Sequence, residues 1–181
     1  MDNKGKEVSF GLIFIIMGIS LAIAFFWDSF PLIKDNVHLV LNPSAGALLN
    51  WNLMGGMLIL VFIISIVTTL IQKYTTDQET LKEMKKEQKI LQEQMKEFKD
   101  NPEKIMELQK KSFEFLPKTM KLSMRSIIYT GVPFILLFRW FNDYFIAAGN
   151  PKFFGFIGWI WFYLIVTIIF SSILRKKMDV V

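Results

Sequence analysis

The sequence predicts an all-α integral membrane protein, and three observations carry that prediction. Apolar residues make up 52% of the 181 residues and charged residues only 20%, whereas soluble domains carry roughly 25% charge. Charged side chains are almost absent from four long stretches, and they gather in one block, residues 73–125. This distribution excludes a soluble globular enzyme, a disordered chain and, because the chain has no cysteine, a disulfide scaffold.

The four apolar stretches are the candidate membrane-spanning helices, because a helix of roughly 20 residues crosses a hydrocarbon core of about 30 Å. They are residues 9–27, 51–72, 126–148 and 153–174. The third stretch contains Arg139 and Asp143, so we expect its outer end to be polar or to face protein. These two residues are spaced i,i+4, which predicts an intramembrane ion pair, although Arg139 could instead extend to the outer interface.

The first stretch has a competing interpretation as a signal peptide. Lys4 and Lys6 form a basic tail, and residues 22–24 (Ala-Ile-Ala) resemble a cleavage site. We expect an uncleaved helix, a signal anchor, because the apolar run is long and Phe25 and Phe26 follow the site at once.

The positions of Lys and Arg predict the orientation. Of the 21 basic residues, 18 lie in the N-terminal tail, in block 73–125 and in the C-terminal tail. The loops at 28–50 and 144–152 hold one each. Because short cytoplasmic segments are enriched in Lys and Arg, we expect a multi-pass plasma membrane protein with both termini and the charged block in the cytosol.

The charged block predicts an antiparallel coiled-coil hairpin. Two apolar seams with alternating spacings of three and four are separated by Asn101 and Pro102, an N-cap and a first helical position. The seams are Leu81, Met84, Gln88, Leu91, Met95 and Phe98, then Ile105, Leu108, Ser112 and Phe115. Between residues 77 and 116, nine lysines face ten acidic residues, which favours a solvated surface over a nucleic-acid site with sequence specificity.

The stretch 110–125 predicts a short amphipathic helix, broken at Pro117, that lies on the cytosolic interface. Met120 and Met124 would offer an adaptable apolar surface to a client segment, since methionine suits varied partners. Basic residues near the membrane would attract anionic lipid headgroups.

Hydroxyl and amide side chains recur in the cytosolic halves of three predicted spans. They are Ser65, Thr68, Thr69, Gln72, Ser126, Thr130, Thr167 and Ser171. If these faces converge, they line a polar recess in the inner leaflet. The alternative is hydrogen bonding between helices or back to each helix's own carbonyls.

From residue 50 to 177, the order span, hairpin, amphipathic stretch, span, span resembles the YidC/Oxa/Alb superfamily, and specifically its archaeal YidC-like members. It is also similar to the third subunit of the endoplasmic reticulum membrane protein complex. The local strings that carry the resemblance are Lys73-Tyr74-Thr75-Thr76-Asp77-Gln78 and Phe138-Arg139-Trp140-Phe141.

The resemblance implies a three-helix insertase core preceded by an extra N-terminal transmembrane helix. It also implies an insertase or chaperone for nascent membrane proteins, with a hydrophilic groove open to cytosol and lipid. The hairpin and basic tails would meet ribosomes or targeting factors. One departure is clear: bacterial relatives carry a basic residue on the first core helix, and residues 52–72 contain none.

Two other functions compete with the insertase. A structural adaptor would dock a partner or ribosome through the hairpin, and a channel subunit would use Arg139 and Asp143 along a path. The one histidine, His38, has no partner motif nearby, so the sequence predicts no enzyme, no metal site and no cofactor. The expected organisation is 1–27, an N-terminal helix; 28–50, an outer loop; 51–72, core helix 1; 73–125, the hairpin and amphipathic segment; 126–148, core helix 2; and 149–181, core helix 3 with a basic tail.

Overall fold

A computed structural model describes residues 10–180, apart from the side chains of residues 10, 123 and 125. The basic tail with Lys4 and Lys6 lies outside the described residues. Within them the fold is all-helical, with one isolated bridge between Phe153 and Ile157 and no strand. The elements in chain order are α1 (Phe10–Phe25), η1 (Trp27–Ser29), α2 (Pro31–Leu41), η2 (Asn42–Gly46), α3 (Ala47–Trp51), α4 (Leu53–Thr75), α5 (Gln78–Glu97), α6 (Pro102–Ala147) and α7 (Trp159–Met178).

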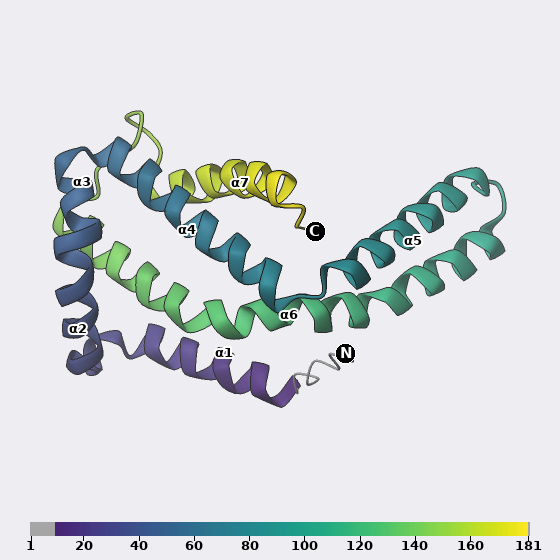
Figure 1. The fold of residues 1–181 in the computed structure, drawn as a ribbon, viewed down its shortest axis with the longest axis horizontal. Coiled ribbons are helices and arrows are strands. Elements are labelled where there is room, and N and C mark those ends of the chain that lie inside the picture. Colours follow the sequence, from purple (N-terminus) through teal and green to yellow (C-terminus); the bar gives the residue numbers. More distant parts are fainter. Residues whose placement is uncertain (1–9, 181) are drawn as a thin grey trace.

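The helices pack in a row, α1 on α6, α6 on α4 and α4 on α7 (Figure 1). Helices α2 and α3 cross one end of this bundle, which we call the α2 end. A hairpin of α5 and the first part of α6 projects from the other end, which we call the hairpin end. The expected loop 28–50 is therefore mostly helical.

Two helices, α4 and α7, are long and apolar enough to cross a membrane. The two parts of α6, Pro102–Leu122 and Ser126–Ala147, meet at a bend of 60° and add a third candidate if the bent pair counts as one broken span. Helix α1 is apolar but has 16 residues, about 24 Å at 1.5 Å per residue. The structure thus offers two or three candidate spans among the described residues, and the fourth stays a prediction.

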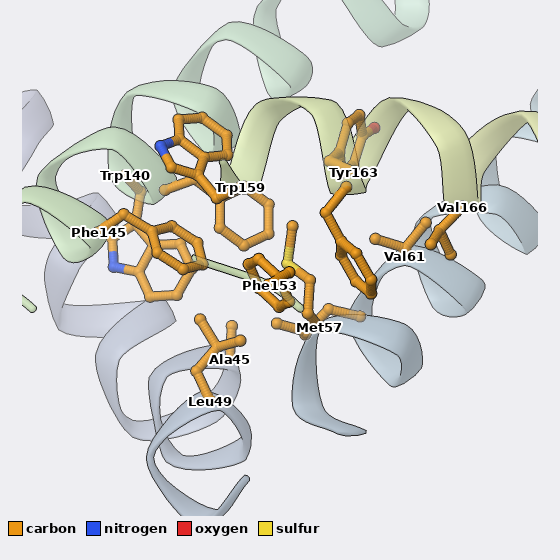
Figure 2. Close-up of a cluster of buried hydrophobic side chains, with 13 residues drawn as sticks. Ala45, Leu49, Met57, Val61, Trp140, Phe145, Phe153, Trp159, Tyr163 and Val166 are labelled. Carbon is orange, nitrogen blue, oxygen red and sulfur yellow. The ribbon is translucent and has the colours of Figure 1, made fainter. Parts of the chain in front are cut away.

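The apolar core lies at the α2 end (Figure 2). Trp140, Phe141 and Phe145 of α6 are completely buried there. The ring of Phe145 stacks on Trp159 with centroids 5.4 Å apart. The buried side chains of α4 and α6 nearer the hairpin end are polar: Ser65, Thr69 and Ser126 are at most 7% exposed. Apolar packing therefore holds one end of the bundle, and polar groups are enclosed towards the other.

The turn from α3 into α4 depends on a close backbone approach. Asn52 is the N-cap of α4, and its side chain accepts a 2.7 Å hydrogen bond from the Gly55 nitrogen. A Cβ on Gly56 would lie 2.3 Å from the carbonyl oxygen of Leu48. Only glycine fits this position without a shift of the backbone.

The hairpin follows the predicted seam. Its seam positions are buried or half-buried from Leu81 to Met95 and from Ile105 to Phe115, and most of their neighbours are exposed. Phe98, also a predicted seam position, is exposed because it lies at the C-cap of α5, where the arm ends. Asn101 is the N-cap of α6, its side chain accepts from the Lys104 nitrogen at 3.2 Å, and Pro102 is the first helical residue. The N-cap prediction is confirmed.

The predicted break at Pro117 is wrong. Helix α6 continues through Pro117, and its bend falls later, between Leu122 and Ser126. An interior proline removes one backbone hydrogen bond, at roughly 3 kcal/mol. Beside Pro117 the ring of Phe115 is half-buried, and the Thr119 hydroxyl donates to the Phe115 carbonyl at 2.9 Å.

Candidate functional site

The polar face of α4 is narrower than the sequence pattern suggested. Ser65 is 0% exposed and Thr69 is 2% exposed. Thr69 and Gln72 are four and seven residues after Ser65, and residues at these spacings lie within about 40° of the first one around a helix. The Thr69 hydroxyl donates to the Ser65 carbonyl at 2.7 Å. The Ser65 hydroxyl is buried and has no hydrogen-bond partner among the described atoms.

At the hairpin end this face leads to a cavity of about 240 Å³, the hairpin-base cavity. Four helices contribute to it. Its lining residues are Gln72 in the last turn of α4, Thr76 at the C-cap of α4, Gln78 and Leu81 of α5, Ser126 and Ile127 of α6, and Arg175 of α7. The Gln78 amide donates to the Gln72 carbonyl at 2.9 Å, so α5 is fixed to the end of α4.

The hairpin-base cavity unites two predicted residues, Gln72 and Ser126, and adds three that sequence reasoning missed: Thr76, Gln78 and Arg175. Arg175 was counted only as a tail residue that sets orientation. Nothing in the sequence indicates that the last turn of α7 folds back against the start of the hairpin.

A second space, the α4–α6 groove, has a volume of about 270 Å³ and almost entirely apolar walls. Its lining residues are Ile63, Ile64, Val67, Thr68 and Ile71 of α4 with Tyr129, Thr130, Pro133, Phe134 and Leu137 of α6. The Thr68 and Thr130 hydroxyls donate to their own helices, at the Ile64 carbonyl (2.8 Å) and the Ser126 carbonyl (2.9 Å). The hydroxyls of these two predicted residues are therefore already hydrogen-bonded within their own helices, and they lie in an otherwise apolar wall.

The groove and the cavity draw on the same two helices. On α4, Ile71 lines the groove and Gln72 the cavity; on α6, Tyr129 lines the groove and Ile127 the cavity. The residues predicted to line one polar recess are thus divided between an apolar groove and a polar cavity.

The remaining predicted residues lie apart from these spaces. Thr167 and Ser171 of α7 line neither. Met120 is half-exposed at 50% on α6, and Met124 is half-buried.

At the α2 end, the expected ion pair between Arg139 and Asp143 is not formed. Asp143 accepts hydrogen bonds from the Trp27 indole at 2.7 Å and the His38 ring at 2.9 Å, and the Lys34 ammonium lies 3.7 Å away. The Arg139 guanidinium lies over the Trp27 ring, 5.7 Å from its centroid. Because α2 crosses the end of α6, it brings donors to Asp143 that the i,i+4 spacing could not reveal.

Two further hydrogen bonds fix the segment from η1 to α3 (residues 27–51), which we call the connector, to α6. The Trp140 indole donates to Asn42 at 2.8 Å, and the Tyr144 hydroxyl donates to Asn50 at 2.7 Å. Lys34 also donates to Asp28 at 2.6 Å, and this hydrogen bond raises the pKa of Lys34 above its ordinary value. The partners of Trp140 and Tyr144 are 98 and 94 residues away in the chain, so no local pattern signals these two contacts.

No group of three metal-ligating side chains is present in the part of the chain that the structure describes. The arrangement is that of a multi-pass, all-helical membrane protein with a small polar cavity beside an apolar groove, from which a coiled-coil hairpin projects.

The model of one family, described as integral membrane protein EMC3/TMCO1-like, matches residues 38–153, more than half of the chain. The chain belongs to this family, which lies in the YidC/Oxa/Alb superfamily and includes archaeal insertases, as the sequence pattern predicted. Its members are non-enzymatic, insertase- or chaperone-type membrane proteins. The match runs from α2 to the start of the segment before α7, so it leaves out α1. No curated protein and no solved structure matches the chain.

Proposed function

We propose that the protein assists the insertion of nascent membrane proteins. The carrying observation is that helices α4 and α6 line both a polar space, the hairpin-base cavity, and an apolar one, the α4–α6 groove. A segment entering the bilayer has an apolar stretch and a polar flank, and transfer of an unpaired polar group into hydrocarbon costs several kcal/mol. A polar cavity would receive the flank while the apolar stretch moves along the groove into lipid.

In the proposed topology the hairpin and both termini face the cytosol of a plasma membrane, and α1 is the additional fourth span. The distribution of basic residues supports this orientation. Nascent chains would arrive at the hairpin end, where Met120 and Met124 offer the first apolar contact. The hairpin and basic tails would meet the ribosome or a targeting factor.

The test is site-specific photocrosslinking in membranes that translate a single-span client. A photoreactive amino acid replaces Thr68 in the groove wall or Met120 beside the hairpin. The control replaces Ile168, which is 66% exposed on α7 and lines neither space. We expect crosslinks to the nascent chain from Thr68 and Met120 and not from Ile168. Equal yields at all three positions would contradict a client-holding groove.

The adaptor remains the second candidate because the hairpin carries exposed apolar side chains away from its seam. Met106 is 70% exposed and Phe113 is 65% exposed. A docking arm needs such a surface. Crosslinks from Thr68 and Met120 to resident proteins alone would favour this function.

A further inference from the structure

The hairpin-base cavity contains one charged side chain, Arg175, with no acidic residue in its lining. The Nε atom of Arg175 is buried and has no hydrogen-bond partner among the described atoms. Arg175 also forms no ion pair within the described part of the chain. Asp179, four residues later in the chain, is paired with Lys82 instead.

The rest of the polar lining is neutral. Gln72 and Gln78 supply amides, while Thr76 and Ser126 supply hydroxyls and are 8% and 7% exposed. Arg175 is half-buried with its Nε atom fully enclosed, so it is partly desolvated without a counter-charge, and a guanidinium is suited to bidentate contact with phosphate. The cavity is therefore suited to an anion.

The position of the cavity narrows the anion to one carried by a lipid. Arg175 is in the last turn of α7, followed by Lys176 and Lys177, and Lys73 is in the last turn of α4. Basic residues at the ends of membrane helices lie at the level of the headgroups. Helices α4 and α7, which contribute to the cavity, are the two helices apolar enough to cross a membrane, so an amphiphile could place its phosphate at Arg175 and its acyl chains in the surrounding lipid.

We propose that the hairpin-base cavity binds the phosphate of an anionic phospholipid, with Arg175 as the cation that holds it. The proposal stands on the cavity and its charge, and it does not depend on client insertion. The shared chemistry is a phosphate group, which a lipid headgroup or free phosphate could supply.

The experiment measures binding to the purified full-length protein in neutral detergent, by native mass spectrometry and titration calorimetry. The probes are dihexanoyl-phosphatidylglycerol, dihexanoyl-phosphatidylcholine and inorganic phosphate. The variants are Arg175→Gln and Arg175→Lys. The matched control is Lys176→Gln, which removes the same charge from the exposed adjacent residue.

We expect one phosphatidylglycerol bound per chain, more tightly than phosphatidylcholine. Loss of a charge-assisted contact in Arg175→Gln should weaken binding roughly tenfold or more. Arg175→Lys should bind with intermediate affinity, and it keeps the test open if Arg175→Gln does not fold. Lys176→Gln should bind like the wild type.

Equal losses in Arg175→Gln and Lys176→Gln would overturn the site, because they would mean a diffuse surface effect. Inorganic phosphate that binds as tightly as phosphatidylglycerol and displaces it would overturn the lipid assignment. Lipid binding is measured without a client. A negative result here therefore does not bear on the insertion hypothesis, which the crosslinking experiment tests separately.

Discussion

The indole nitrogen of Trp27 donates a 2.7 Å hydrogen bond to the carboxylate of Asp143, 116 residues further along the chain. Trp27 is 1% exposed and lies at the junction of α1 and α2. The same carboxylate accepts from His38 of α2. Asp143 therefore fixes the whole N-terminal connector to the end of α6.

We expect Asp143→Ala to destabilise the fold, because it leaves the buried Trp27 donor unpaired, at about 1–3 kcal/mol. Asp143→Asn keeps an acceptor oxygen and should lose less. Thermal unfolding in detergent, together with hydrogen exchange in α2, measures both effects. Identical unfolding of the two variants and the wild type would show that this contact does not hold the connector.

Gly56→Ala should also destabilise the protein, since the new methyl group would lie 2.3 Å from the Leu48 carbonyl oxygen. Overpacking of this kind costs about 1–3 kcal/mol. The matched control is Gly18→Ala in α1, where a Cβ meets nothing within 4 Å. The same melting experiment should show a lower transition temperature for Gly56→Ala only.

Gln72→Leu should reduce the insertion of a client with a polar flank by about tenfold, because it removes an amide from the cavity wall. Thr68→Val changes a hydroxyl that is bonded to its own helix and should have little effect. Protease protection of the client in reconstituted vesicles gives both rates. A normal rate for Gln72→Leu, with wild-type folding, would count against the cavity as the polar element.

The ion pair between Lys82 and Asp179 connects the hairpin to the end of α7. The hydrogen bond from Lys82 holds the pKa of Asp179 below its ordinary value. A lowered carboxyl pKa means that the contact is present at neutral pH and is lost as pH falls through the folded-state pKa, below about pH 4.

Spin labels on Gln92 of α5 and Ser172 of α7, both exposed, would measure this connection. We expect a broader distance distribution in Lys82→Ala at neutral pH, and in the wild type only on acidification. A distribution unchanged by either treatment would mean that other contacts position the hairpin.

The sequence predicted the helices with strong periodicity. The span expected at 51–72 is α4, Leu53–Thr75, and the hairpin begins its second arm at the predicted N-cap Asn101. Both depend on interactions within a few turns. Spacing alone grouped Thr68 with Thr69, but the two lie about 100° apart on a helix, so one faces the groove and the other is buried.

What the sequence could not predict depends on contacts between distant segments. Asp143 has a neighbour of opposite charge at i−4, Arg139, yet its partners come from the connector. Arg175 looked like one of three equivalent tail residues, but only its side chain lines the cavity. A proline in a helix interior is unfavourable, yet α6 continues through both Pro117 and Pro133.

The two arms of the hairpin join the bundle in unequal ways. Helix α4 passes to α5 through Thr76 and Asp77, which have extended backbones, whereas the second arm and the membrane part of α6 are one helix from Pro102 to Ala147. The first arm is thus separated from α4 by a non-helical break, whereas the second arm is continuous with the helix that forms one wall of the α4–α6 groove. We therefore expect a displacement of the hairpin tip to reach the groove through α6.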